Sequence, residues 1–112
     1  MTLARDIKAE IELLATEHGG RSTPAKSGIR PQFYYHGHDW VVALTFINQE
    51  WVAPGESVQA YVTFLSPQKH VDKIHPGMPF LVREGSRVVG FGAVKEIVEL
   101  EASAKRVRDA RS

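Results

Sequence analysis

The stretch that decides the fold of this chain is Pro54-Gly55-Glu56-Ser57-Val58-Gln59-Ala60-Tyr61-Val62-Thr63-Phe64. Val58, Ala60, Val62 and Phe64 alternate in it with Gln, Tyr and Thr side chains. This period of two predicts a β-strand with one buried face. The Pro-Gly pair in front predicts a tight turn, because proline presets φ and glycine accepts the positive φ of a type II turn. The segment is therefore expected to be a strand entered from a turn.

The flanking sequence continues the same pattern. Residues 31–35 and 40–47 are rich in aromatic and β-branched side chains, and Gly37 between them supplies a turn. Residues 66–79 hold three prolines, two histidines and Gly77, and predict a long loop. The strand pattern resumes at residues 80–82, and Gly85-Ser86 turns the chain into residues 87–98. These segments predict further strands, the last two joined as a hairpin.

The secondary structure of the two ends of the chain is less clearly predicted by the sequence. Residues 7–14 fit a half-buried strand by alternation and a helix by propensity, and the local sequence supports both equally. Residues 19–28 carry three glycines and a proline and predict a loop. Residues 99–112 are charged, acidic first and basic last, and predict a short helix or a frayed tail. Together the segments predict an all-β barrel or sandwich of six antiparallel strands.

Composition excludes several classes of function. Of the 112 residues, 43% are hydrophobic and 24% charged, which is typical of a single globular domain. The formal charge is only +1, so nucleic acid can be bound only by a local patch. The chain contains no cysteine, which excludes disulfides, thiolate metal sites and a cysteine nucleophile. We expect a cytoplasmic protein without a membrane segment, since no apolar run approaches about 18 residues.

Four segments, in order, resemble the C-terminal domain of elongation factor Tu. They are Gly19-Gly20-Arg21-Ser22-Thr23-Pro24, Arg30-Pro31-Gln32-Phe33-Tyr34, Ala53-Pro54-Gly55-Glu56 and Arg83-Glu84-Gly85-Ser86-Arg87-Val88-Val89-Gly90-Phe91-Gly92. The resemblance implies a six-stranded antiparallel closed barrel over residues 7–98, with residues 7–14 as its first strand. Residues 1–6 then form an N-terminal extension and residues 99–112 a charged tail or helix. Only the last domain of the factor is matched, so no GTPase activity is expected.

The resemblance also implies a function and a set of contact residues. In the intact factor this domain grips the T stem of transfer RNA and meets the exchange factor Ts. The matching positions that imply contact with phosphate and ribose are Arg21, Thr23, Gln32, Glu84 and Gly85. Arginine forks onto phosphate, and a glycine lets backbone approach closely. We therefore expect a non-catalytic module that binds RNA of transfer-RNA shape and needs no cofactor.

Departures from the family pattern support an alternative function. Ser22 stands where the family usually has histidine, Ser86 replaces a glycine, and His36-Gly37-His38 replaces Arg-Thr-Thr. Residues 68–76 also make a loop longer than the family's. The alternative is a protein-interaction module or decoy that imitates the factor's last domain, with the exchange factor or a toxin as partner and no role in RNA binding. The sequence does not determine the oligomeric state.

Two other groups of residues are candidate sites that also have ordinary structural explanations. Arg30, Arg83, Arg87 and Lys95 could join Arg21 in a basic face, or be solvated cations paired with Glu84 and Glu96. His36 and His38 would share one face of a strand, as a two-ligand metal site with His70 or His75 requires, but turn-flanking histidines are commonly just solvated.

Three further patterns bear on nucleotide binding, base stacking and catalysis. Residues 20–27 differ from a phosphate loop because Ala25 replaces the second glycine and Gly28 and Pro31 prevent a following helix, so no nucleotide site is expected. Trp40 is expected in the core, while Trp51 is compatible with either a core position or a stacking platform for bases. No paired carboxylates, serine elbow or acid-oriented histidine indicate an enzyme.

Overall fold

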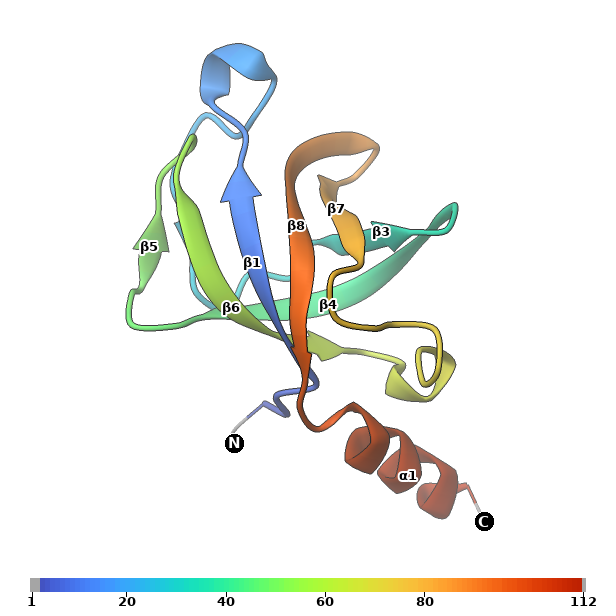
Figure 1. The fold of residues 1–112 in the computed structure, drawn as a ribbon. Helices are drawn as coiled ribbons and strands as arrows, with labels where there is room; N and C mark the ends of the chain where they lie inside the picture. Colours follow the sequence, from blue (N-terminus) through green and yellow to red (C-terminus); the bar gives the residue numbers. More distant parts are fainter. Residues whose placement is uncertain (1–2, 112) are drawn as a thin grey trace.

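The computed structural model describes residues 3–111. Within this part, antiparallel strands close into a barrel (Figure 1), in the order β1 (Ile7–Leu13), β6 (Ser57–Phe64), β4 (His38–Phe46), β3 (Gln32–Tyr35), β7 (Pro79–Glu84) and β8 (Arg87–Ile97). The remaining elements are the 3-10 turns η1 (Thr16–His18) and η2 (Pro67–Lys69), the paired short strands β2 (Ala25–Lys26) and β5 (Trp51–Val52), and helix α1 (Leu100–Ala110). The expected six-stranded closed barrel is confirmed.

The inward positions of the strands fill the barrel. All four apolar residues of the alternating β6 pattern, Val58 to Phe64, are buried. Inside the barrel, the rings of Phe33 on β3 and Phe80 on the neighbouring β7 stack with centroids 4.1 Å apart. Each such side chain contributes about 1.5–3 kcal/mol when removed from water. The core therefore depends on the period-two pattern that the sequence displays.

Residues 7–13 of the undecided segment 7–14 are a strand because of partners far along the chain. Ile7 lies opposite Val62 of β6 on one side and Ile97 of β8 on the other. Both neighbours supply ladder hydrogen bonds and burial that an isolated segment lacks. Tertiary pairing thus overrides the helix propensity of the segment.

Residues 19–28 differ in part from the expected loop, because they include β2. Ala25 pairs with Val52 and Lys26 with Trp51. Ala25 and Val52 are both fully buried. The partner strand β5 comes after β3 and β4 in the sequence. The local glycine and proline content of residues 19–28 therefore could not predict this pairing.

The charged C-terminal segment forms a helix rather than a frayed tail. Leu100 and Ala104 are buried, and α1 packs against η2. Ser103 donates a hydrogen bond to Oδ1 of the buried Asp6, and the Phe64 amide donates to Oδ2 over 2.8 Å. Burial raises the pKa of Asp6 above its usual 3.8, although both hydrogen bonds act in the opposite direction. Asp6 thus ties the helix to the barrel.

The N-terminal extension expected at residues 1–6 falls partly outside the description, because residues 1 and 2 are not part of it. Figure 1 shows α1 at one end of the barrel and the β7–β8 hairpin at the other. The segment after β1 reaches the same end as the hairpin. Among residues 3–111, no helix has the length and apolar character needed to cross a membrane.

Candidate functional site

The conformation of the loop that follows β1 is fixed by a hydrogen bond within the loop and by close backbone packing at Gly20. Thr16 Oγ1 donates to the Arg21 carbonyl over 2.6 Å, which closes the segment that contains η1. Gly20 passes so close to β1 that a Cβ there would lie 2.0 Å from the Leu14 carbonyl oxygen. Only glycine fits at this position. The conformation presents Arg21 to the β7–β8 hairpin.

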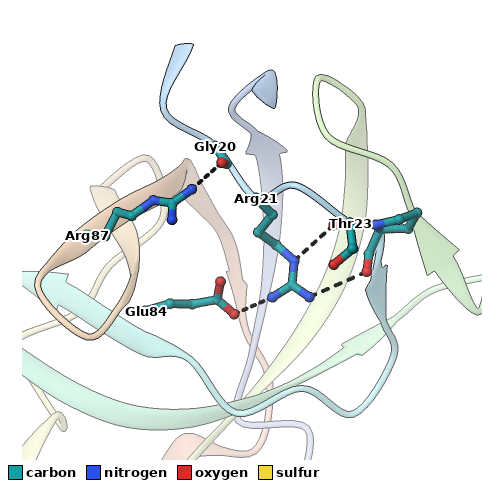
Figure 2. A network of polar contacts seen from close by, with 6 residues as sticks. Gly20, Arg21, Thr23, Glu84 and Arg87 are labelled. Carbon is teal, nitrogen blue, oxygen red and sulfur yellow. Dashed lines mark hydrogen bonds and ion pairs between the residues drawn. The ribbon is translucent and has the colours of Figure 1, made fainter. Parts of the chain in front are cut away.

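Arg21 and Arg87 fasten this loop to the hairpin (Figure 2). The Arg21 guanidinium pairs with the Glu84 carboxylate at the end of β7 and also donates to the carbonyls of Thr23, over 3.2 Å, and Pro24, over 3.4 Å. Arg87, at the start of β8, donates to the carbonyls of Gly19, over 3.1 Å, and Gly20. We call these three charged residues, Arg21, Glu84 and Arg87, the loop–hairpin network.

The loop–hairpin network keeps some capacity for a ligand. A guanidinium carries five N–H donors. The three hydrogen bonds of Arg21 use one N–H on each nitrogen, which leaves one N–H on each Nη. The Arg21 side chain is 19% exposed and that of Glu84 37%. With two cations and one carboxylate, one positive charge stays uncompensated in an ordered, partly open position.

Gly85 and Ser86 form the tip of the hairpin between the paired residues Glu84 and Arg87. Gly85 has φ of +64°, a left-handed conformation that glycine adopts without strain. The Ser86 carbonyl accepts a bond of 3.1 Å from Arg83, which also pairs with Asp39 at 3.0 Å. The hairpin tip is therefore held on the β4 side as well as on the loop side.

Gln32 lies beside the same hairpin, opposite Arg83 in the β3–β7 ladder. Two buried atoms there, Gln32 Oε1 and Arg83 Nε, have no hydrogen-bond partner among the described residues. Both atoms are shielded from solvent, so neither is open to a ligand at the surface of the barrel. Gln32 Oε1 and Arg83 Nε are therefore buried polar atoms, next to the loop–hairpin network, that lack a hydrogen-bond partner among the described residues.

The remaining basic candidates lie apart from the loop–hairpin network. Arg30 is exposed beside Val41 and Leu65, and Lys95 Nζ lies 3.9 Å from the Glu10 carboxylate. Neither makes a hydrogen bond or ion pair with Arg21 or Arg87 in the part of the chain that the structure covers. Glu84 pairs with Arg21, whereas Arg83 pairs with Asp39 and Lys95 lies nearest Glu10.

His36 and His38 do not lie on one strand. β3 ends at Tyr35, His36 occupies the turn with φ of +48°, and β4 begins at His38. The premise of two imidazoles on one strand face was therefore wrong, because the turn at Gly37 separates them. Across residues 3–111, no three His, Cys, Asp or Glu side chains gather as a metal would require.

His70, from the long loop, is buried among aromatic rings. Its Nδ1 lies 2.6 Å from Tyr35 Oη, a hydrogen bond whose proton either partner can supply, and its ring stacks on Phe64 at 4.2 Å. Burial, and to a lesser extent the positive charges of Lys73 and Lys69, together lower the pKa of His70 from 6.5 to about 4. Burial also raises the pKa of the Tyr35 phenol. This histidine is a neutral core residue at physiological pH.

The two tryptophans differ in their surroundings. Trp40 packs against the core and meets the His70 ring edge-on at 4.6 Å, as expected of a core residue. Trp51, on β5, is 53% exposed, with Lys26 Nζ 5.6 Å from its ring centre. The segment 20–27 runs into β2 rather than a helix, so it lacks the helix N-terminus that a phosphate loop needs.

A comparison with family models agrees with this architecture. Residues 1–98 match the model of the elongation factor Tu C-terminal domain. The chain belongs to that family. The elongation factor Tu C-terminal domain is a non-catalytic β-barrel, and membership places this chain among translation-factor-like modules.

Within this elongation factor Tu-like barrel, the sequence missed two contributors to the site. Arg87 was expected only as part of a basic face, whereas it binds the Gly19 and Gly20 carbonyls. Asp39, which pairs with Arg83, was not among the residues expected at the site. The contact between Asp39 and Arg83 follows from strand register. Asp39 lies opposite Tyr34 on one side of β3, and Arg83 lies opposite Gln32 on the other side.

Proposed function

We propose that this chain is a non-catalytic module that binds RNA of transfer-RNA shape at the loop-and-hairpin end of the barrel. Its contact residues are Arg21, Thr23, Gln32, Glu84 and Gly85, with Arg87 holding the loop in place. The observation that supports the proposal is the loop–hairpin network, in which Arg21 and Glu84, 63 residues apart in sequence, meet in one ordered group. Family membership supports a translation-related partner.

The chemistry of the network suits an A-form backbone. Arg21 retains two N–H groups in a fixed orientation, so a phosphate can be bound without ordering a free side chain. The positive-φ Gly85 carries no side chain that would hold a ribose away from the hairpin backbone. Gln32 lies half-buried beside the hairpin, and its side-chain amide can donate a hydrogen bond to a 2′-hydroxyl. Such contacts recognise shape rather than sequence.

A single small surface with a few charged contacts binds weakly. Because one positive charge of the network is uncompensated, we expect an affinity of about micromolar or poorer at physiological salt. Binding is expected to be salt-dependent. Each lost phosphate contact lowers the slope of log K against log salt by about 0.7–0.9.

The test is a titration of fluorescent transfer RNA at about 50 and 200 mM salt, since counterion release dominates this range. The variants are Arg21→Ala, Thr23→Ala and Gln32→Ala, with Lys73→Ala as a control that removes a charge from an exposed position in the long loop. Arg21→Ala is expected to weaken binding about tenfold and to lower the slope by about one contact. The Lys73→Ala protein should bind as the wild type does.

Arg21 also holds the loop, so its variant needs a structural check. Thermal unfolding of each protein shows whether the barrel has stayed folded, and Thr23→Ala removes an exposed side chain that anchors nothing else in the contacts described. The proposal fails if the wild type binds no transfer RNA at low salt. It also fails if folded Arg21→Ala, Thr23→Ala and Gln32→Ala proteins all bind with the wild-type affinity and slope.

A further inference from the structure

A row of apolar side chains crosses the outer surface of three neighbouring strands. Tyr34 of β3 lies opposite Leu81 of β7, and Leu81 lies opposite Phe91 of β8. Their sequence neighbours Phe33 and Phe80 point into the core, so the row faces outward. Phe91 is 42% exposed. An outer barrel face in contact only with water is ordinarily polar.

A hollow opens at one side of this row, where β3 and β7 stop pairing. The ladder between the two strands covers residues 32–34 and 81–83. Past it, Tyr35 and His36 line one wall and Met78, Pro79 and Phe80 another, around a volume of about 410 Å³. The lining is mostly apolar. A hollow of this size accommodates one or two large apolar side chains.

An acidic hollow adjoins the apolar one. It shares Phe91 and Gly92 with it, has a volume of about 180 Å³, and is also lined by Glu10, Glu12 and Lys95. Lys95 lies 3.9 Å from Glu10. Glu12 is exposed, directly opposite Phe91 in the β1–β8 ladder, and forms no ion pair within the described residues. Two carboxylates against one cation leave this end negative.

We propose that this continuous surface, which we call the β3–β7–β8 groove, binds a segment of a partner protein. The segment carries a large apolar side chain that enters the apolar hollow and, next to it, a lysine or arginine that meets Glu12. The negative end disfavours a polyanion such as RNA and favours a cationic side chain. The groove lies toward the start of β7, whereas the loop–hairpin network lies at its end, so both can be occupied.

The test uses three synthetic peptides as probes: Gly-Ser-Leu-Phe-Lys-Arg-Ser-Gly, its charge-reversed form with Glu-Asp, and a form with Ser-Ser in place of Leu-Phe. Amide shifts of the isotope-labelled protein are followed up to about 1 mM peptide, the range of weak peptide binding. The first peptide is expected to shift the amides of Tyr34, Leu81, Phe91 and Gly92. The charge-reversed peptide should bind at least about fivefold more weakly. The Ser-Ser peptide should leave these amides unchanged.

Protein variants provide the matched controls. Phe91→Ser removes the exposed ring and should weaken binding about tenfold, and Glu12→Lys should abolish the preference between the charged peptides. Glu96→Lys changes an exposed charge elsewhere on β8 and should retain both properties. Transfer RNA added instead of peptide should leave the groove amides unchanged, which separates this proposal from RNA binding at the loop–hairpin network.

Several results would overturn the proposal. One is the absence of groove shifts with the first peptide at the highest concentration. Another is equal binding of the charge-reversed peptide, which would show that Glu12 selects no cation. If the same amides shift with protein concentration alone, the occupant is a second copy of this chain and the proposal of a basic partner segment is wrong.

Discussion

Replacing His70 with phenylalanine is expected to remove a pH dependence from the stability of the barrel. His70 is fully buried, with its ring stacked on Phe64 and its Nδ1 bonded to Tyr35. Its pKa is lowered to about 4 from the usual 6.5, first by burial and then by the charges of Lys73 and Lys69. The folded protein thus binds this proton more weakly than the unfolded chain does.

The sign and size follow from proton linkage. Between pH 6.5 and about 4 the unfolded state carries the proton and the folded state does not, so stability falls as the pH falls through this window. At about 1.4 kcal/mol per pH unit, the whole window corresponds to about 3 kcal/mol. A domain of this size is typically stable by about 5–15 kcal/mol, so the loss is a large fraction of the total.

The measurement is urea unfolding at several pH values, followed by circular dichroism. The free energy of unfolding of the wild type should fall with decreasing pH by up to about 1.4 kcal/mol per unit more steeply than that of His70→Phe. The double variant Tyr35→Phe/His70→Phe removes both hydrogen-bonding partners together, so no buried hydroxyl is left unpaired. His75→Gln, at an exposed position in the same loop, should retain the wild-type slope.

Parallel pH profiles of the wild type and His70→Phe would refute this reasoning. Asp6 also titrates with a displaced pKa, but it is present in both proteins and its effect cancels in their difference. Equal slopes would mean that the His70 ring is hydrated or opens readily on protonation.

Three further results are expected. Leu100→Ala should lower the free energy of unfolding by about 2–5 kcal/mol in urea titrations, because it leaves a cavity under α1; no change would show that the helix contributes little. Gly20→Ala should destabilise the loop and weaken transfer RNA binding together, because its Cβ meets the Leu14 carbonyl at 2.0 Å; wild-type melting and binding would contradict the geometry. Burial raises the pKa of Asp6, so the wild type should lose stability as the pH rises above about 4, and Asp6→Asn should remove this loss. Urea unfolding at pH 4 and pH 7 measures the free energy of unfolding of both proteins. A difference between wild type and variant that is the same at both pH values would contradict the prediction.

The candidate site was only partly predictable from the sequence. The resemblance selected Arg21 and Glu84, but nothing in either segment shows that they form an ion pair, because they are brought together only by docking of the loop on the hairpin. The unpaired atoms of Gln32 and Arg83 depend on the register between β3 and β7. The burial of His70 depends on rings from three separate strands.

The sequence by itself determined the strands whose side chains alternate, such as β6, and the turns at Pro54-Gly55 and Gly85-Ser86, because period two and positive φ are local properties. Only the tertiary structure decided that residues 7–13 are a strand and that Ala25 pairs with Val52, because those ladders require distant partners. Likewise, α1 is held by the buried Leu100 and by Asp6 at the other end of the sequence. The apolar row of Tyr34, Leu81 and Phe91 exists only once three strands lie in register.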